Sequence, residues 1–386
     1  MGGAPRASIE EGQGNLEGAQ KIMGNSFSIL LMIAAVLTVV LQLFAEPLLL
    51  TFGASENTIG YAMDYMRIYS LGTVFVLLTL GMNAYITAQG FTTVSMKTVL
   101  IGAGLNMVLD PILIFGLHMG VKGAALATIC SQAVSMLWVL RFLLGKQTKW
   151  RLRKSDMKLV PSVFLPSLAL GLSPFIMQST ESLLAVCFNS SLLKYGGDIA
   201  VGAMTVLSSI MQFAMMPLQG LTQGAQPIIS YNYGAQNASR VRTAFRCLLR
   251  ASLVYSAVLW ASVMLFPQVF VSLFNNDPRL VGYAVWAVRI YMSAAVLFGI
   301  QLPCQMTFVA LGNAKASLFL AVLRKIILLI PLIFILPNFF ADKAFAVFLA
   351  EPAADVLAVA ATAVLFAVQF RRSMTALDSG GPRKAS

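Results

Sequence analysis

The sequence has 386 residues, of which 58% are hydrophobic and only 11% are charged. Soluble domains carry roughly 25% charged residues, so this composition excludes a soluble protein and indicates an integral membrane protein. The formal net charge is +12, but the basic residues gather in short loops between apolar segments. A nucleic-acid-binding protein would carry them on one folded, soluble surface, so we expect no nucleic-acid partner.

Ten apolar segments are long enough to cross a bilayer, since a helical span needs about 20 mostly apolar residues. Membrane β-barrels instead show strands of roughly ten residues with alternating hydrophobicity, and these runs are longer and uninterrupted. The sequence therefore predicts an all-α integral membrane protein with about ten complete transmembrane helices. The predicted helices cover residues 26–45, 62–87, 98–117, 121–144, 160–190, 199–226, 243–266, 282–310, 317–337 and 344–370.

The basic residues also predict the orientation of the chain, because Lys and Arg concentrate in cytoplasmic loops. The loop at 145–159 carries six of them, and the loop at 46–61 on the other side carries none. The C-terminal end adds four more, Arg371, Arg372, Arg383 and Lys384. We therefore expect the basic loops and both termini to be cytoplasmic.

Two stretches of the chain repeat each other. Residues 60–70 read GYAMDYMRIYS and residues 282–292 read GYAVWAVRIYM, at an offset of 222. At the same offset, GQGN at 12–15 matches GAQN at 234–237. The matching helices are six spans apart, an even number that preserves direction, so the pattern predicts two parallel repeats related by an axis along the membrane normal.

The repeat also predicts the domain boundaries. The later half begins near residue 160 and has one whole helix and part of another before its GAQN, whereas the earlier half has no equivalent of these. We therefore expect an N-terminal lobe at 1–144 that lacks its first helix and part of its second. A basic cytoplasmic linker at 145–159, a C-terminal lobe at 160–372 and a cytoplasmic tail at 373–386 follow.

Asp110 is the most informative single residue, because it lies inside the apolar run LNMVLDPILIF at 105–115. A carboxylate near the middle of a bilayer costs at least ~2.5–3.5 kcal/mol, and such residues usually serve an ion or proton path. Asn106 lies four residues earlier and so shares its helix face, and Pro111 disturbs the helix beside it. The pattern favours a small cation or proton site; the alternative is a structural N-cap at Asp110 with Pro111 at the first helical position.

The second half offers a less sharply defined set of polar and flexible side chains. Glu181 is its best candidate for a coupling carboxylate, although a position near the membrane interface would explain it without function. Unbranched, polarisable methionines suit a pocket that accepts many shapes, with ordinary packing as the alternative. The candidate substrate-binding residues are Met177, Gln178, Met211, Gln212, Met215 and Asp355.

The sequence contains no motif for enzymatic catalysis or ATP hydrolysis. The phosphate-binding pattern G-x-x-x-x-G-K-[ST] does not occur, and one histidine with four dispersed cysteines provides no metal-ligand set. We therefore expect a protein that is not an enzyme, has no cofactor or bound metal beyond a coupling ion, and takes its energy from an ion gradient.

Four stretches resemble the MATE family of multidrug and toxin extrusion transporters in its bacterial branches: LNMVLDPILIFGL (105–117), GVKGAALATICSQ (120–132), PLQGLTQGAQPIISYNYGAQN (217–237) and ALGNAKASL (310–318). The resemblance implies twelve helices in two six-helix lobes in the bacterial plasma membrane. It further implies a monomeric secondary antiporter that exports cationic or amphipathic drugs in exchange for H⁺ or Na⁺, with membrane lipids around it.

The resemblance assigns roles to five residues by motif. Asn106 and Asp110 occupy the positions of a cation or proton site, Thr128 stands in the following helix, and Asn83 lines the same cavity. If the ion is Na⁺, its ligands would be Asp110, Asn106 and Thr128. Glu181 resembles a glutamate in the first helix of the second lobe. The stretch 298–308, however, has no carboxylate where some members place an aspartate.

Two other functions compete with drug export. One is a flippase for lipids or polysaccharide precursors, which would line its cavity with buried Arg or Lys. Arg67, Arg289 and the pair Arg324–Lys325 are expected near helix starts instead. The other is a truncated transporter without activity, because the helix expected before residue 1 would supply one wall of the Asp110 site.

Overall fold

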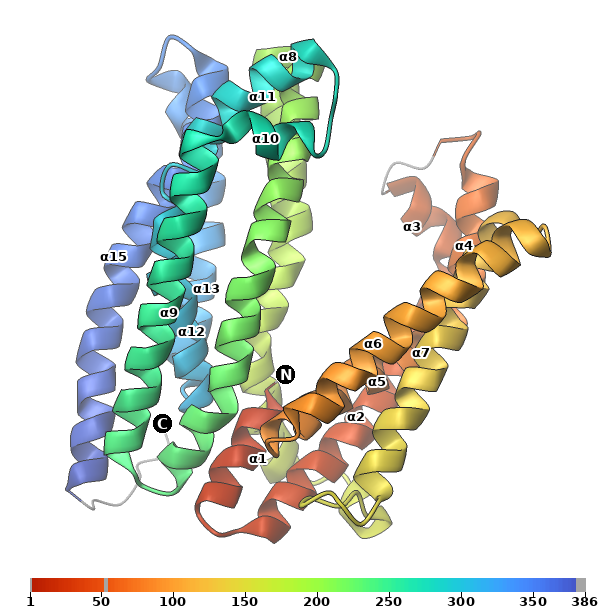
Figure 1. Cartoon of the computed structure of the whole chain (residues 1–386), viewed down its shortest axis with the longest axis vertical. Helices are drawn as coiled ribbons and strands as arrows, with labels where there is room; N and C mark the ends of the chain where they lie inside the picture. Colours follow the sequence, from red (N-terminus) through yellow and green to blue (C-terminus); the bar gives the residue numbers. More distant parts are fainter. Residues whose placement is uncertain (1, 52–54, 380–386) are drawn as a thin grey trace. The chain divides into compact units, whose positions relative to one another are not determined.

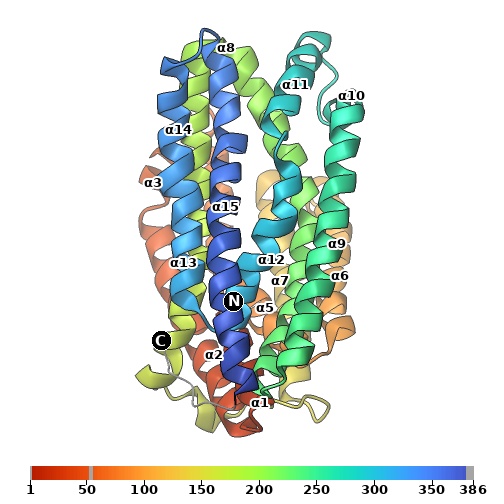
Figure 2. The ribbon, with the colours of Figure 1, turned by 90° about the vertical axis from the view of Figure 1, so that its left-hand side faces the viewer.

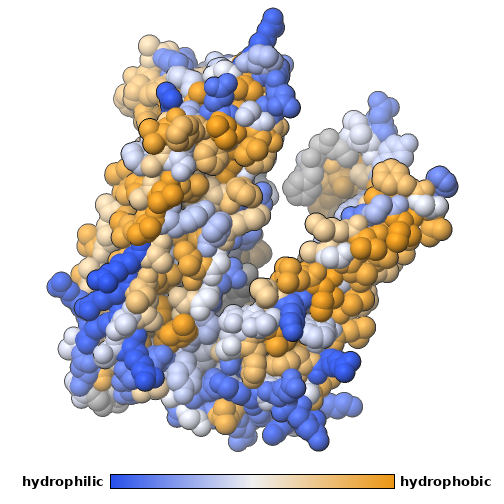
Figure 3. Space-filling model, in the orientation of Figure 1, coloured by the Kyte–Doolittle hydropathy of each residue, from blue (hydrophilic) through white to orange (hydrophobic). Residues whose placement is uncertain are grey.

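The computed structural model describes residues 2–51 and 55–379, and every regular element in them is helical. The chain divides into two compact units, Gly3–Ser167 and the residues from Leu168 onward. In each unit, hydrophobic surface covers the middle of the helices and hydrophilic surface gathers toward their ends (Figure 3). This distribution is the one expected for helices that cross a bilayer.

The first unit is a bundle built mainly from α2, α5, α6 and α7 (Figure 1). Its elements are α1 (Gly3–Gly12), α2 (Leu16–Leu43), α3 (Ala45–Thr51), α4 (Ile59–Leu71), α5 (Thr73–Ala88), α6 (Thr92–Pro111), the π-helix η1 (Ile112–Gly116), α7 (Gly120–Leu144) and the 3₁₀ turn η2 (Lys154–Met157). The basic segment after α7 packs onto this bundle, because Trp150 is fully buried and its backbone N–H donates to Gln89 Oε1 at 2.9 Å.

In the second unit, α15 packs against α11, α12, η4 and α14 (Figure 2). The elements are α8 (Pro161–Gly234, of which the part up to Ser167 belongs to the first unit), α9 (Ala238–Leu265), α10 (Pro267–Ser272), α11 (Pro278–Tyr291), η3 (Ala295–Leu297), α12 (Phe298–Ala310), α13 (Ala314–Val322), the π-helix η4 (Leu323–Leu329), α14 (Ile330–Ile335), η5 (Leu336–Asn338) and α15 (Lys343–Asp378). Phe188, Tyr291 and Phe348 belong to its largest hydrophobic core.

The element α8 is two helices joined at a sharp turn. Its 74 residues would extend about 110 Å at 1.5 Å per residue, far more than a bilayer core of about 30 Å. Gly197, with φ of 67°, breaks the helical geometry, and the two legs run in opposite directions from it (Figure 1). Glycine tolerates this positive φ without steric cost, so the turn falls between the predicted helices 160–190 and 199–226.

The described residues contain seven helices long and apolar enough to cross a membrane, or nine if each of two bent pairs forms one span. Since α8 contains two legs, the prediction of about ten transmembrane helices is confirmed. The predicted helices 62–87 and 282–310 are not straight, however. They are bent by 52° between α4 and α5 and by 48° between α11 and α12.

The first bend lies where the chain passes closely over α7. A Cβ at Gly72 would lie 2.5 Å from the Ile129 side chain, so only glycine fits there without displacing Ile129. Sequence periodicity alone does not reveal such a bend, because both arms remain apolar.

The internal repeat reappears in the helix boundaries. At the offset of 222, α2 (Leu16–Leu43) corresponds residue for residue to α9 (Ala238–Leu265). Both helices begin with an asparagine cap: Asn15 accepts from Gly18 N at 2.9 Å, and Asn237 accepts from Arg240 N at 3.1 Å. Because their caps and lengths coincide, α2 and α9 have the same local structure although their side chains differ.

Candidate functional site

The predicted pair in the first unit lies on α6. Asn106 Nδ2 donates a hydrogen bond to Asp110 Oδ1 at 3.3 Å, and both side chains are half-buried. Asp110 is not an N-cap, because it lies inside α6 and the helix continues through η1 to Gly116. The six residues that follow Asp110, up to Gly116, correspond to about 9 Å of helix. Asp110 therefore lies toward one end of the span and not near its middle, the position that the sequence suggested.

Pro111 widens the helix without interrupting it. A proline has no N–H to donate to the preceding turn, and η1 follows directly with π-helical bonding, in which Leu117 N donates to Ile112 O at 2.8 Å. Short π-helical turns inside α-helices are frequent at functional sites. The aspartate therefore stands immediately before a turn whose backbone is already rearranged.

Helix α7 contacts the segment 92–116 both before and after the Asn106–Asp110 pair. Ser135 Oγ donates to Thr98 O at 3.2 Å, and a Cβ at Gly123 would lie 2.7 Å from Leu113 O. Thr128 lies on α7 between these two contacts, but its hydroxyl donates to Ala124 O at 3.0 Å within its own helix.

Asn83 lies on α5 and turns its amide nitrogen toward α6. Its Nδ2 donates to Ser95 O at 3.3 Å, while its Oδ1 is buried without a hydrogen-bond partner in the described part of the chain. The structure thus brings Asn106 and Asp110 into direct contact, and it shows no such contact for Thr128 or Asn83.

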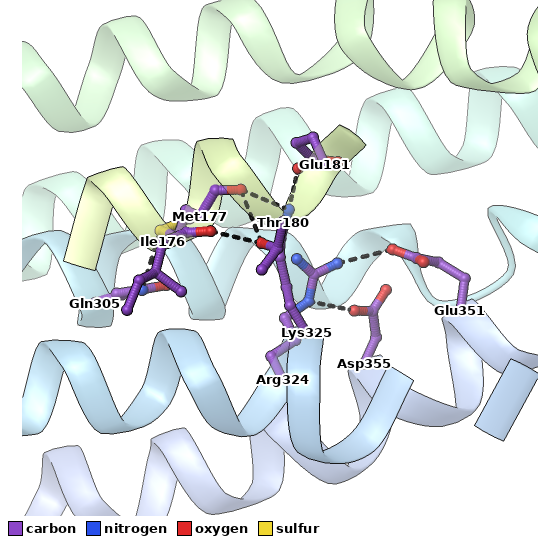
Figure 4. A network of polar contacts seen from close by, with 9 residues as sticks. All are labelled: Ile176, Met177, Thr180, Glu181, Gln305, Arg324, Lys325, Glu351 and Asp355. Atoms are coloured by element: carbon purple, nitrogen blue, oxygen red, sulfur yellow. Dashed lines mark hydrogen bonds and ion pairs between the residues drawn. The ribbon is translucent and has the colours of Figure 1, made fainter. Parts of the chain in front are cut away.

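In the second unit, two carboxylates share one guanidinium. Arg324, on η4, donates from Nε to Asp355 Oδ1 at 2.7 Å and from Nη2 to Glu351 Oε1 at 2.9 Å (Figure 4). The carboxylates lie four residues apart on α15 and therefore on one helix face. All three side chains are at most 11% exposed, and the guanidinium lies over the Phe298 ring at 4.8 Å.

Lys325 turns away from Arg324 toward α8. Its ammonium pairs with the Glu181 carboxylate and donates to Met177 O at 3.3 Å (Figure 4). Gln305 on α12 donates to Met177 Sδ at 3.1 Å. The lysine side chain is 5% exposed, whereas that of Glu181 is 61% exposed. The Glu181 carboxylate therefore reaches the surface of its unit, and the ammonium that it pairs with is buried.

We call these five residues (Glu181, Arg324, Lys325, Glu351 and Asp355) the C-terminal charge cluster. They comprise three carboxylates and two cations, so their formal sum is −1. Burying an uncompensated charge is costly, and each buried cation here has at least one carboxylate partner. The cluster has no free buried cation to offer to a ligand.

The other predicted substrate-binding residues divide between surface and core. Gln178 and Gln212 are exposed. Met211 and Met215 are half-buried and pack against the main hydrophobic core of the second unit. Of the predicted set, the structure therefore joins Met177 to Glu181 through Lys325, and it places Asp355 in the same charge cluster.

Sequence reasoning missed the role of Arg324 and Lys325. The sequence placed them near a helix start, but the structure places Arg324 ten residues after the start of the apolar segment Ala314–Asn338, and Lys325 next to it. The available signal was charge complementarity: a basic pair within one apolar segment, and Glu351 and Asp355 at helical spacing in the next. Antiparallel neighbours in a bundle bring such segments together.

These features define the class: a multi-pass helical membrane protein with several ionisable residues buried inside a helix bundle, as in a membrane transporter. The sequence matches the model of the MatE family over residues 1–112 and 174–335. The chain therefore belongs to the MATE family of transporters and is not an enzyme.

Relatives and solved structures agree with this membership. The chain is 28% identical over 318 residues to the multidrug export protein MepA of Staphylococcus haemolyticus, covering 82% of this chain and 70% of MepA. It is 36% identical to the MATE multidrug transporter DinF-BH, solved in complex with R6G, with a TM-score of 0.87 over 95% of this chain and 82% of that one. A MATE structure in the bent conformation, 22% identical, shares the fold with a TM-score of 0.90, covering 98% of this chain and 83% of that one.

Proposed function

We propose that the protein exports cationic or amphipathic drugs across the bacterial plasma membrane in exchange for H⁺ or Na⁺. The names of its relatives support export: MepA is a multidrug export protein, and DinF-BH is a multidrug transporter solved with R6G. Uphill export needs an energy source, and the sequence contains no nucleotide-binding motif, so an ion gradient is the source that fits.

One observation carries the coupling proposal: Asp110 is a half-buried carboxylate without an internal cation. In the described part of the chain, Asn106 is its side-chain hydrogen-bond partner, and no Lys, Arg or His lies within ion-pair distance. Glu181, Glu351 and Asp355 all have cationic partners within the protein. Asp110 is therefore the membrane carboxylate left to take a proton or Na⁺ from outside the protein.

Ion binding at Asp110 would act on the adjoining π-helical turn. A bound ion shifts a conformational equilibrium only if it binds one state more tightly than the other. The turn Ile112–Gly116 begins two residues after Asp110 and packs its backbone against Gly123 of α7. Neutralising the carboxylate would change the preferred packing of this turn on α7. The two conformations of the turn would then bind the ion with different affinities.

The charge cluster of the second unit favours cationic substrates over anionic ones. Its formal sum is −1, and its most exposed member is the carboxylate of Glu181. A flippase for anionic precursors would need a buried cation free to bind them, and Arg324 and Lys325 are both occupied by carboxylates. The charges therefore support drug export more than the flippase alternative.

The proposed orientation places both termini in the cytoplasm. The basic segment 145–159 and the arginines at the end of α15 lie at helix ends, as the rule for cytoplasmic loops requires.

Transport by purified protein in proteoliposomes tests the proposal. We expect R6G to move against its gradient when either a pH or a Na⁺ gradient is imposed, and the effective gradient identifies the ion. Asp110→Asn should abolish this movement. The matched control is Asp64→Asn, which removes an acid whose pair with Lys122, at 3.4 Å, is about half exposed and should leave transport intact. Unchanged transport by Asp110→Asn would refute the coupling role of Asp110.

A further inference from the structure

A basic pocket of about 360 Å³ lies between α9 and α15 of the second unit. It belongs to neither the Asp110 pair nor the charge cluster. The pocket is lined by Arg242, Phe245, Arg246, Phe370, Arg371, Met374 and Thr375. Hydrophilic surface covers the ends of α9 and α15 in this region (Figure 3).

The pocket has more positive than negative charge. Arg242 pairs with Asp378, whose side chain is 51% exposed. Arg246 and Arg371 are exposed and have no carboxylate within ion-pair distance in the part of the chain that the structure describes. With three guanidinium groups and one carboxylate, the formal excess is +2, so an anionic ligand is favoured.

The wall of the pocket is apolar and aromatic. The Phe245 ring lies 5.1 Å from Phe370 and 4.6 Å from Phe366, and Phe366 and Phe370 stack at 4.9 Å. These rings join α9 to α15, and Phe245 and Phe370 line the pocket together with the three arginines. A ligand that fills the pocket therefore meets both cations and hydrocarbon.

The apolar character continues along both helices toward the middle of the membrane. On α9, positions 242, 246, 250, 254 and 258 form one row at four-residue spacing, and it changes from arginine to valine, with Val254 and Val258 more than 60% exposed. On α15, Val368 and Val364 lie three and seven residues before Arg371 and are 46% and 67% exposed. Charge at the end of the helices and exposed hydrocarbon beyond it match the shape of a phospholipid.

We propose that this pocket binds the phosphate headgroup of an anionic phospholipid, with the acyl chains along the exposed valines of α9 and α15. Guanidinium groups bind phosphate with paired, charge-assisted hydrogen bonds, and basic pockets between transmembrane helices bind anionic headgroups. A free phosphate would use the arginines but not the aromatic and aliphatic surface. The inference rests on the proposed orientation, because this end must face the cytoplasmic leaflet.

The test is lipid binding by the full-length protein, measured separately from transport. Purified protein in detergent is titrated with phosphatidylglycerol, phosphatidylcholine or inorganic phosphate. Retained lipid is counted by native mass spectrometry, and thermal stability is followed. Arg246→Gln/Arg371→Gln removes two charges from the pocket. Arg240→Gln/Arg372→Gln is the matched control, because it removes two charges from the same helix ends without changing a residue that lines the pocket.

We expect phosphatidylglycerol to be retained and to raise the melting temperature, and phosphatidylcholine and inorganic phosphate to do neither. Since each basic residue near an anionic lipid surface contributes about fivefold in affinity, the pocket variant, which lacks two, should bind phosphatidylglycerol about 25-fold more weakly. The control should bind normally, because the residues that it changes do not line the pocket. Equal loss in both variants, or an equal effect of inorganic phosphate, would overturn the proposal. Failure of drug transport with normal lipid binding would instead count against the proposed function.

Discussion

Arg324 and Asp355 are 31 residues apart in the chain, yet Arg324 Nε lies 2.7 Å from Asp355 Oδ1. The pair fastens η4 to α15 at the middle of two apolar segments, where the guanidinium also holds Glu351. Buried ion pairs of this kind do not necessarily add net stability, but removal of one partner leaves the other charge without compensation. Arg324 is thus the cationic partner of both carboxylates on α15.

Replacing Arg324 by methionine is the first prediction. Glu351 and Asp355 would remain buried on one helix face without their cation, so we expect the free energy of unfolding to fall by about 3–5 kcal/mol. The measurement is thermal or denaturant unfolding of the purified protein in detergent. Lys315→Met is the control, because Lys315 is exposed on α13 and its loss should change stability by less than ~0.5 kcal/mol.

A triple variant separates charge from packing. Arg324→Met combined with Glu351→Gln and Asp355→Asn removes all three charges while keeping similar volumes. We expect it to recover most of the lost stability, because neutral replacements of buried ion pairs are often tolerated. If the triple variant is as unstable as Arg324→Met, the guanidinium acts mainly through its packing on Phe298.

The sequence alone predicted much of this fold because the bilayer imposes simple rules. Span length was sufficient to predict the ten helices, and the offset of 222 was sufficient to predict that α2 and α9 share their boundaries. The bends at Gly72 and after Tyr291 were not predictable in this way, because a bent span and a straight one have the same hydropathy. What differs is a close approach to a neighbouring helix, such as that of Gly72 to Ile129.

The candidate site was predictable where its partners are close in sequence. Asn106 and Asp110 are one helical turn apart, so their contact followed from periodicity. The contact between Lys325 and Glu181 joins residues 144 positions apart, and local spacing carries no information about it. The sequence therefore predicted that Asp355 binds substrate, although the structure shows that Arg324 pairs with its carboxylate.

The Lys325–Glu181 pair leads to a second prediction, for a double-mutant cycle. Lys325→Met and Glu181→Gln each leave one member of the pair without its partner, and the cost should be larger for Glu181→Gln because the abandoned ammonium is the more buried group. The double variant should be more stable than additivity predicts, by about 0.5–3 kcal/mol. Unfolding of the four proteins under one condition provides the cycle, and strict additivity would mean that the two groups do not interact.

A third prediction concerns the helix caps that the repeat places at equivalent positions. Asn237 begins α9 by accepting a hydrogen bond from Arg240 N at 3.1 Å, and Asn237→Ala should lower the free energy of unfolding by about 1 kcal/mol. Asn237→Ser keeps a capping oxygen and should be close to the parent protein. Asn15→Ala tests the same contact at α2. Equal stability of the alanine and serine variants would show that the cap contributes nothing.

The last prediction concerns the contact of α7 with the π-helical turn after Asp110. A methyl group at Gly123 would lie 2.7 Å from Leu113 O, and backbone cannot move aside as a side chain can. Gly123→Ala should therefore cost about 1–3 kcal/mol of stability and, because it displaces the turn next to Asp110, should also slow drug transport. Gly104→Ala is the matched control on α6, since a methyl group there meets no atom within 4 Å and alanine favours the helix by about 1 kcal/mol. Unfolding and R6G transport are measured on both variants. Slower transport by Gly123→Ala together with normal transport by Gly104→Ala would tie the turn to the transport cycle, whereas normal transport by a destabilised Gly123→Ala would confine this contact to folding.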